Sequence, residues 1–215
     1  MIQISLQAVP RCAYDWVRER KNAYQTILSL QSKFQKMKKT IVILSALIFT
    51  SIISAAQTFT LKSNDIGGQA VNKQFANSFG CHGENISPQL SWENAPKETQ
   101  SFAVTMYDKD APTGSGFWHW LIFNIPANIM ELKSNAGDIT KAIAPPGSVQ
   151  SNTDAGKPGY LGPCPPPGPS HQYLITVFAL KGKLELDKNA TPAVVGFYLS
   201  QQTIAKAALV MYGQQ

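Results

Sequence analysis

Two stretches of the sequence combine turn residues with a histidine beside an apolar segment. In the first, YDKDAPTGSGFWHWLIFNIPAN, Asp108 lies in an acidic turn that precedes the aromatic run around His119. In the second, the proline- and glycine-rich segment 156–169 leads to His171 and Tyr173. Imidazole, phenol hydroxyl and backbone N–H groups can bind anion oxygens, and a carboxylate can orient a histidine. The repeated pairing of a turn with an imidazole predicts that both stretches contribute to one pocket.

The same side chains allow a metal-site alternative. Asp108 or Asp110 with His119 and His171 could form a site of two histidines and one carboxylate. However, no short His-x-His spacing preorganises these residues. We therefore expect neither a metal nor another cofactor.

A hydrolytic alternative would use Ser115 or Ser170 beside a histidine and an aspartate. Serines next to glycine or proline are usually turn residues. The sequence also lacks the G-x-S-x-G, G-x-x-x-x-G-K-[ST] and H-E-x-x-H motifs of common enzyme classes. A binding protein is favoured over an enzyme, and a weak hydrolase or metal-dependent enzyme stays open as an alternative.

Short alternating segments predict the strands that hold these residues. Turn residues separate the segments, which cover residues 59–61, 89–92, 102–106, 118–125 and 173–180. This pattern is typical of a mainly β protein, an antiparallel β-sandwich.

Alternation also predicts which faces of the strands are buried. Segment 102–106 is apolar on one face, which predicts a half-buried strand, whereas segment 173–180 is apolar on both faces, which predicts an interior strand. In segment 118–125, alternation puts Trp118 and Trp120 on the face opposite His119.

The end of the chain changes to a helical pattern. Thr191 can cap a helix with Pro192 at its first position, and apolar residues at 194, 195, 198 and 199 recur at helical spacing. We expect one or two short helices to finish the chain.

Segment 156–169 cannot be a central strand, because its prolines lack the N–H that a sheet requires. Proline also fixes φ, and an apolar segment follows at once. The segment therefore predicts a rigid loop on the rim of the pocket.

Residues 37–56 have the pattern of a secretory signal peptide. The apolar run 40–53 follows Lys36, Lys38 and Lys39, and small residues close the segment at Ala56. A membrane span needs roughly 20 apolar residues, and this run is shorter. We expect residues 1–36 to be an upstream extension or a long n-region. Cleavage after Ala56 would leave residues 57–215 as a secreted or periplasmic domain without a transmembrane segment.

This division changes the charge argument. Residues 1–56 contain eight basic and two acidic residues, a balance of 8 − 2 = +6, so residues 57–215 keep 11 of the 19 basic and 11 of the 13 acidic residues and are neutral. No cluster of Lys and Arg remains in the domain. Nucleic acid is therefore excluded as a partner.

Cysteine use agrees with an oxidising compartment. The domain contains only Cys81 and Cys164, because Cys12 lies in the leader. An even pair in such a compartment predicts a disulfide. Two small buried thiols are the alternative.

Three stretches of the chain resemble one protein family. YDKDAPTGSGFWHWLIFNIPAN and GKPGYLGPCPPPGPSHQYLITVFAL are similar to the two signatures of the phosphatidylethanolamine-binding proteins, which include Raf kinase inhibitor protein and plant flowering regulators. CHGENISPQLSWENAP resembles the segment that begins the domain in bacterial members. The resemblance implies a β-sandwich with a pocket for phosphate or a phosphorylated head group. By motif, the ligand-binding residues would be Asp108, Asp110, Pro112, His119, Gly162, Pro163, His171 and Tyr173.

The chain departs from the family pattern at two positions. Gly116 stands where eukaryotic members often carry an acidic residue, and Gln172 stands where many members carry arginine. The resemblance therefore implies no particular head group, and kinase inhibition does not transfer to a secreted bacterial-type chain. We expect a secreted small-molecule-binding protein. The rival interpretation is a secreted modulator or inhibitor of another protein, in which the pocket is only inherited.

Overall fold

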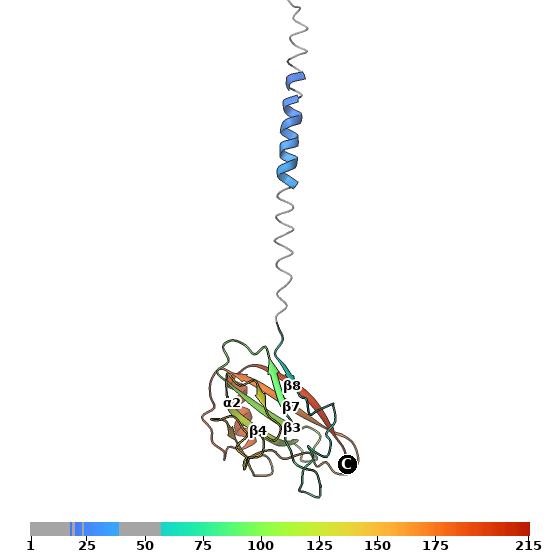
Figure 1. Cartoon of the computed structure of the whole chain (residues 1–215), viewed down its shortest axis with the longest axis vertical. Coiled ribbons are helices and arrows are strands. Elements are labelled where there is room, and N and C mark those ends of the chain that lie inside the picture. The colour runs from blue at the N-terminus through green and yellow to red at the C-terminus, as the bar shows by residue number, and fades with distance from the viewer. Residues whose placement is uncertain (1–17, 19, 23, 39–56) are drawn as a thin grey trace, which may run out of the picture. The chain divides into compact units, whose positions relative to one another are not determined.

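The computed structural model describes residues 18, 20–22, 24–38 and 57–215 (Figure 1). The chain divides into two compact units, Met1–Ala56 and Gln57–Gln215. The described residues of the first unit are helical. The expected signal-peptide core and its cleavage site lie outside the described residues. Within the described part of the chain, no helix is both long and apolar enough to cross a membrane.

The second unit is the antiparallel β-sandwich that the alternating segments predicted. The smaller sheet has the strand order β1-β2-β5 and the larger sheet the order β6-β4-β3-β7-β8. In chain order the strands are β1 (Thr60–Lys62), β2 (Leu90–Glu93), β3 (Ser101–Asp108), β4 (Phe117–Pro126), β5 (Glu131–Leu132), β6 (Val149–Gln150), β7 (His171–Leu180) and β8 (Thr203–Gly213).

The main core fills the space between the two sheets. Leu90 and Trp92 of β2 meet Phe102, Val104 and Met106, which point from one face of β3. All five side chains are almost completely buried. Apolar burial of this kind contributes about 1.5 to 3 kcal/mol for each large side chain, so the sandwich holds the larger sheet in place.

Helix α2 (Pro192–Gln202) covers the other face of the larger sheet. Val195 and Leu199 pack against Ala103, Leu121 and Phe123. The helix begins at the predicted proline, although the side chain of the preceding threonine makes no capping hydrogen bond. The expectation that β3 is half-buried is wrong, because this helix covers the face that would otherwise be exposed to solvent.

The predicted C-terminal helix is present, but the expectation that helices finish the chain is wrong. After the single C-terminal helix, the eleven-residue strand β8 pairs with β7 over its whole length. The sequence did not predict this strand, because Lys206, Ala207 and Ala208 have a high intrinsic preference for helix. Cross-strand pairing overrides that preference. Strand β8 also gives β7 a neighbour on each side, which confirms the prediction of an interior strand.

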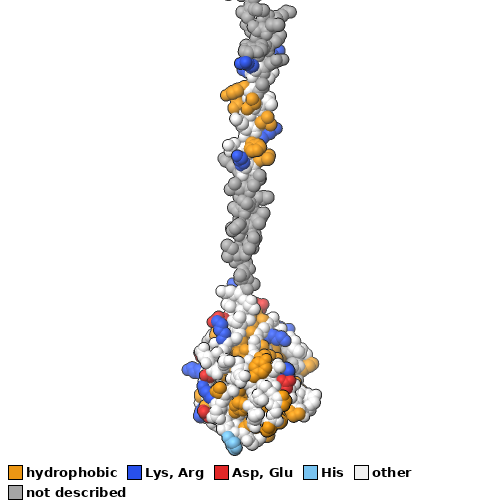
Figure 2. Space-filling view, turned by 90° about the vertical axis from the view of Figure 1, so that its right-hand side faces the viewer, with side chains coloured by type: hydrophobic (Ala, Val, Ile, Leu, Met, Phe, Trp, Pro, Cys, Tyr) orange, Lys and Arg blue, Asp and Glu red, His pale blue; other side chains and the backbone are white. Residues whose placement is uncertain are grey.

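On one face of the domain, charged side chains are interspersed rather than clustered. In Figure 2, Lys side chains of the 57–215 unit, which contains no Arg, lie among Asp and Glu side chains, with apolar side chains between them. A continuous basic footprint of the kind that tracks nucleic acid is absent from this face.

Candidate ligand-binding pocket

The pocket lies where three strands of the larger sheet end together. Asp108, the last residue of β3, is paired with Phe117 on one side and with Tyr173 on the other. His171 is the first residue of β7, two positions before Tyr173. Strand pairing therefore brings the two sequence signatures, which lie far apart in the chain, into one row.

A β-bulge turns His119 toward this row. Met106 pairs with Trp120, and Tyr107 pairs with Trp118. Between these two pairs β3 advances by one residue and β4 by two, so β4 contains one extra residue. As a result Trp120 packs into the main core, whereas Trp118 packs against the cluster on the helix side. The expectation that both tryptophans oppose His119 therefore holds for Trp118 and is wrong for Trp120.

Asp108 fixes the geometry of a turn and of a histidine. Its Oδ1 accepts a hydrogen bond from the backbone N–H of Asp110 at 2.9 Å, and its Oδ2 accepts one from His171 Nδ1 at 2.8 Å. Both side chains of the Asp108–His171 pair are buried. The carboxylate does orient a histidine, and the structure identifies that histidine as His171.

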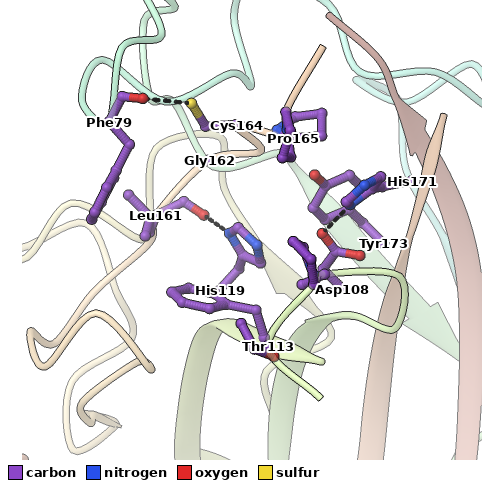
Figure 3. A pocket seen from close by; sticks show the side chains of 14 residues that line it. Phe79, Asp108, Thr113, His119, Leu161, Gly162, Cys164, Pro165, His171 and Tyr173 are labelled. Carbon is purple, nitrogen blue, oxygen red and sulfur yellow. Dashed lines mark hydrogen bonds and ion pairs between the residues drawn. The ribbon is translucent and has the colours of Figure 1, made fainter. Parts of the chain in front are cut away.

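His119 is oriented by a backbone carbonyl instead. Its Nδ1 lies 2.9 Å from the Leu161 carbonyl oxygen, which can only accept, so Nδ1 carries the proton. The ring is 6% exposed. Burial lowers the pKa of His119, and the Leu161 carbonyl and the Asp108 carboxylate oppose that shift. In Figure 3 the ring points from Leu161 toward Asp108 and Tyr173.

Tyr173 places an unpaired hydroxyl in the same space. The residue is 0% exposed, and no described residue meets the distance and angle of a hydrogen bond to its hydroxyl, although the Asp108 carboxylate is close enough to act on it. Burial, followed by the nearby Asp108 carboxylate, raises the pKa of Tyr173, so the phenol keeps its proton. A buried hydroxyl without a partner is a donor that a ligand could satisfy.

The proline-rich loop closes the pocket as the sequence predicted. The Leu161 N–H donates to the His119 carbonyl, and the Gly162 N–H donates to Asn85 Oδ1 at 2.8 Å. The N–H of Ala76 donates to the Pro163 carbonyl. These bonds hold the loop against β4 on one side and against segment 74–85 on the other.

The predicted disulfide fastens the same two segments. Cys81 and Cys164 are bridged, with their Cα atoms 5.8 Å apart. Cys164 lies in the proline-rich loop, and the Phe79 carbonyl oxygen lies 3.4 Å from its Sγ. The bridge therefore ties the loop that carries Phe79 to the rim of the pocket.

The cavity is half open to solvent, small and mostly apolar. It has a volume of about 170 Å³, and no Lys or Arg side chain lines it. Its walls are Phe79, Asp108, Ala111, Pro112, Thr113, Phe117, His119, Leu161, Gly162, Cys164, Pro165, Pro166, His171 and Tyr173. A few polar groups among apolar walls are characteristic of small-ligand sites.

The structure brings most of the predicted ligand-binding residues to this cavity. Those that line it are Asp108, Pro112, His119, Gly162, His171 and Tyr173. Two do not: Asp110 accepts hydrogen bonds from the Gln172 N–H and from Lys109, and Pro163 accepts one from Ala76. The Lys109 ammonium lowers the pKa of Asp110. Both residues support the loops rather than face the ligand space, and direct ligand contact by the other six stays a prediction.

Sequence reasoning missed the apolar walls. Phe117 packs against His119 with ring centroids 4.9 Å apart and ring planes tilted by 56°, and Leu161 holds that histidine through its carbonyl. Phe79 comes from a loop that no motif singled out. Its φ is +58° and its side chain is 73% exposed, although it borders the cavity. Neither property is visible in the sequence, where Phe79 is one aromatic residue beside Gly80 and Cys81.

The two departures from the family pattern have structural counterparts. Gly116 has φ +69°, and a Cβ there would lie 2.1 Å from the Tyr107 hydroxyl, so an acidic side chain does not fit without rearrangement. Gln172 does not line the cavity and contributes only its backbone to the Asp110 contact.

The catalytic alternatives find little support in this geometry. Neither Ser115 nor Ser170 lines the cavity. Among the residues that the structure describes, no three His, Cys, Asp or Glu side chains converge as metal ligands. Asp108 and His171 are hydrogen-bonded to each other, so these two groups do not both point at a possible ion.

A β-sandwich with a small, largely apolar pocket at the end of its central strands defines a ligand-binding class of protein. A family model described as phosphatidylethanolamine-binding protein matches residues 67–214. The chain therefore belongs to the phosphatidylethanolamine-binding protein family.

Individual relatives agree with this assignment. Escherichia coli (strain K12) YbcL is 42% identical over 175 residues, which cover 80% of this chain and 96% of YbcL. YbhB of the same strain is 43% identical over 152 residues, 69% of this chain and 96% of YbhB. Both matches extend over nearly the whole relative.

Solved structures show the same fold. The crystal structure of E. coli YbcL, described as a new member of the mammalian PEBP family, superposes with a TM-score of 0.71 at 43% identity and covers 73% of this chain and 98% of that one. A PEBP homologue of Chlamydia trachomatis gives a TM-score of 0.62 at 26% identity, with 74% and 98% covered.

Proposed function

We propose that the 57–215 domain is a small-molecule-binding protein whose pocket takes phosphate or a phosphorylated head group. The observation that carries the proposal is the Tyr173 hydroxyl, which is buried at the cavity without a hydrogen-bond partner. An unsatisfied buried hydroxyl costs about 1 to 3 kcal/mol. A ligand oxygen that accepts from this hydroxyl would remove that cost.

The size and walls of the cavity support a small ligand. A volume of about 170 Å³ is below the range of drug-sized sites, which begins near 300 Å³. Phe117 and Pro112 give the cavity apolar walls that a short carbon substituent could contact. The polar groups of the two histidines and of Tyr173 lie together at the end of the sheet.

Secretion to the periplasm or the cell exterior is part of the proposal. The Cys81–Cys164 bridge supports an oxidising compartment, and residues 37–56 have the composition of a signal peptide. N-terminal sequencing of protein from the cell envelope should find a start near Gln57. Envelope protein that retains residues 1–36 would contradict both the processing and the compartment.

Calorimetric titration at pH 6 with phosphate and phosphoethanolamine tests the binding function. His119→Ala should weaken binding about 5- to 150-fold, which corresponds to the roughly 1 to 3 kcal/mol of one hydrogen bond to a charged group. Asp108→Ala should also weaken binding, because His171 loses its orienting partner. Lys183→Ala is the matched control, since Lys183 is exposed and does not line the cavity.

Two outcomes would overturn the proposal. One is a wild-type protein that binds neither ligand at millimolar concentration, and the other is His119→Ala protein that binds as tightly as wild type. Either result would favour the rival interpretation, in which the domain acts on another protein.

A further inference from the structure

We propose that Asn189 is an acceptor for N-linked glycosylation and that the co-substrate is an activated sugar, a glycosyl diphosphate. The site is separate from the pocket, since Asn189 does not line the cavity. The inference rests on the secretion that the proposed function includes, and it is independent of the ligand that the pocket takes.

The sequence contains two copies of the acceptor motif for this modification. The motif is Asn-x-Ser/Thr, in which the middle residue is not proline. It occurs at residues 85–87 (NIS) and at residues 189–191 (NAT). A motif this short also arises by chance. Access to the asparagine amide in the folded domain therefore decides which copy can be used.

Asn189 lies in an exposed turn that leads into α2. The helix begins at Pro192, and both Asn189 and Thr191 are exposed. Hydrogen bonds hold the backbone of the turn. Asp187 Oδ1 accepts from the Asn189 N–H at 2.8 Å, and the Asn189 carbonyl accepts from Asn152 Nδ2 at 3.3 Å. The fold therefore presents the acceptor side chain to solvent on a fixed backbone.

The side chains of this copy are not needed by the core of the domain. Asn189 Nδ2 donates to one group among the described residues, Asp187 Oδ2 at 3.2 Å, and both residues are exposed. Thr191 occupies the N-cap position of α2, yet its hydroxyl makes no capping hydrogen bond. A transferring enzyme can therefore bind both motif side chains without breaking a buried contact.

The other copy of the motif is built into the loops beside the pocket. Asn85 Nδ2 donates to the Tyr160 carbonyl at 3.2 Å, and Asn85 Oδ1 accepts from the Gly162 N–H at 2.8 Å. Ser87 is 0% exposed, and its Oγ accepts from the Gly137 N–H. A sugar on this asparagine would displace these bonds. The folded domain thus protects one copy and exposes the other.

The chemistry is a glycosyl transfer without a redox step. Asn189 Nδ2 forms a bond to the anomeric carbon of the sugar, and the bond from that carbon to the diphosphate oxygen breaks. The diphosphate leaves with the electron pair, and Nδ2 gives one proton to a base of the transferring enzyme. An amide nitrogen is a poor nucleophile, because its lone pair is delocalised. The Asp187 carboxylate accepts from Nδ2 and thereby polarises electron density toward that nitrogen.

The helix after the turn has an apolar surface that a glycan would screen. Helix α2 contains no charged residue, and Val194, Phe197 and Tyr198 are exposed. Their spacing puts them on one face of the helix, and the two aromatic rings lie 5.7 Å apart. Apolar side chains that gather on a surface are prone to associate with other molecules. A polar glycan at the start of α2 would oppose such association.

Mass spectrometry of the protein from the organism that produces it tests the inference. The protein is purified from the cell envelope and from the culture medium, and its intact mass is compared with that of the chain beginning near Gln57. We expect an excess of whole sugar residues. Peptide fragmentation that leaves sugars attached should place them on Asn189, and the peptide that contains Asn85 should be unmodified.

Three variants expressed in the same organism assign the modification to the motif. Asn189→Gln and Thr191→Ala should both lose the excess mass, although Thr191→Ala retains the acceptor asparagine. Thr191→Ser is the matched control, because it keeps a hydroxyl at the third motif position and should keep the sugar. Both positions are exposed, so the variants should fold, and a thermal melt checks this.

The outcomes separate this inference from the proposed function. Protein that retains residues 37–56 and carries no sugar would overturn the proposed secretion together with the inference. Protein that begins near Gln57 with an unmodified Asn189 would overturn the inference alone. A sugar that survives in Asn189→Gln would also overturn it. So would a sugar on Asn85, because the fold would then not decide which copy of the motif is used.

Discussion

Two buried tyrosines near the pocket differ in a single hydrogen bond. The Tyr160 hydroxyl donates to the Gln74 carbonyl at 3.0 Å, whereas the Tyr173 hydroxyl has no such partner. Buried hydroxyls are normally satisfied, because an unpaired one loses its hydration without compensation. The difference fits a structural role for Tyr160 and, under the proposed function, a ligand-binding role for Tyr173.

Replacing each tyrosine by phenylalanine should give opposite results. Tyr173→Phe should leave the free energy of unfolding unchanged or raise it by about 1 kcal/mol, while phosphate binding weakens. Tyr160→Phe should lower the free energy of unfolding by about 1 to 2 kcal/mol, because it strands the Gln74 carbonyl. Chemical denaturation and calorimetry of both variants measure the pair of effects. A Tyr173→Phe protein that is destabilised and binds phosphate normally would contradict this account.

The sequence predicted the polar residues of the site better than their hydrogen bonds. His119, His171 and Tyr173 could be chosen because each stands in a turn-and-strand motif that supplies chemistry. The partner of Asp108 could not be chosen, because two histidines were candidates and a one-residue bulge decides how each ring points. Alternation alone placed Trp120 on the wrong face for the same reason.

At the scale of elements, the pocket depends on how closely the proline-rich loop approaches segment 74–76. A Cβ at Gly162 would lie 2.1 Å from the Gln74 carbonyl oxygen, closer than any two such atoms can come. That contact is between backbones, so neither side can move aside as a flexible side chain would. Only glycine permits this approach.

Gly162→Ala should therefore lower the free energy of unfolding by about 1 to 3 kcal/mol and weaken ligand binding, because the loop must withdraw from its place on the rim. Gly196→Ala in α2 is the control. A Cβ there meets no atom within 4 Å, and alanine should stabilise the helix by about 0.5 to 1 kcal/mol. Equal stability of the two variants in a denaturant titration would count against the close approach.

Elements with strong alternation or distinctive turns were predictable, and the last strand was not. Strands β3, β4 and β7 carry long apolar runs bounded by turn residues. Strand β8 is rich in alanine, and its strand character comes from pairing with β7 rather than from its own residues. The pairing with β7 is a feature of the tertiary structure, and the residues of β8 alone do not indicate it.

For the molecule as a whole, the disulfide connects distant parts of the domain. It joins residues separated by 83 positions in the sequence, and it fixes two loops that border the pocket. In the chain-entropy model, a loop of this length contributes roughly 4 to 5 kcal/mol by restricting the unfolded chain.

The double variant Cys81→Ala/Cys164→Ala should thus lose several kcal/mol of the free energy of unfolding, and it should bind phosphate more weakly because the rim is no longer tied. Thiol titration of the unreduced, denatured protein gives the direct check. The full chain should show one thiol, that of Cys12, because the other two of its three cysteines are bridged. Three thiols before reduction would refute the bridge.

The central claim, that this pocket binds a phosphate group, can be tested on the unmodified protein by imidazole NMR, because the chain contains only three histidines. His119 and His171 line the cavity, whereas His82 does not and serves as an internal reference. Titration with methyl phosphate at pH 6 should shift the ring signals of His119 and His171 in a saturable manner and leave those of His82 unchanged. Unchanged signals at millimolar ligand, or shifts of His82 as large as those of the other two, would contradict the account.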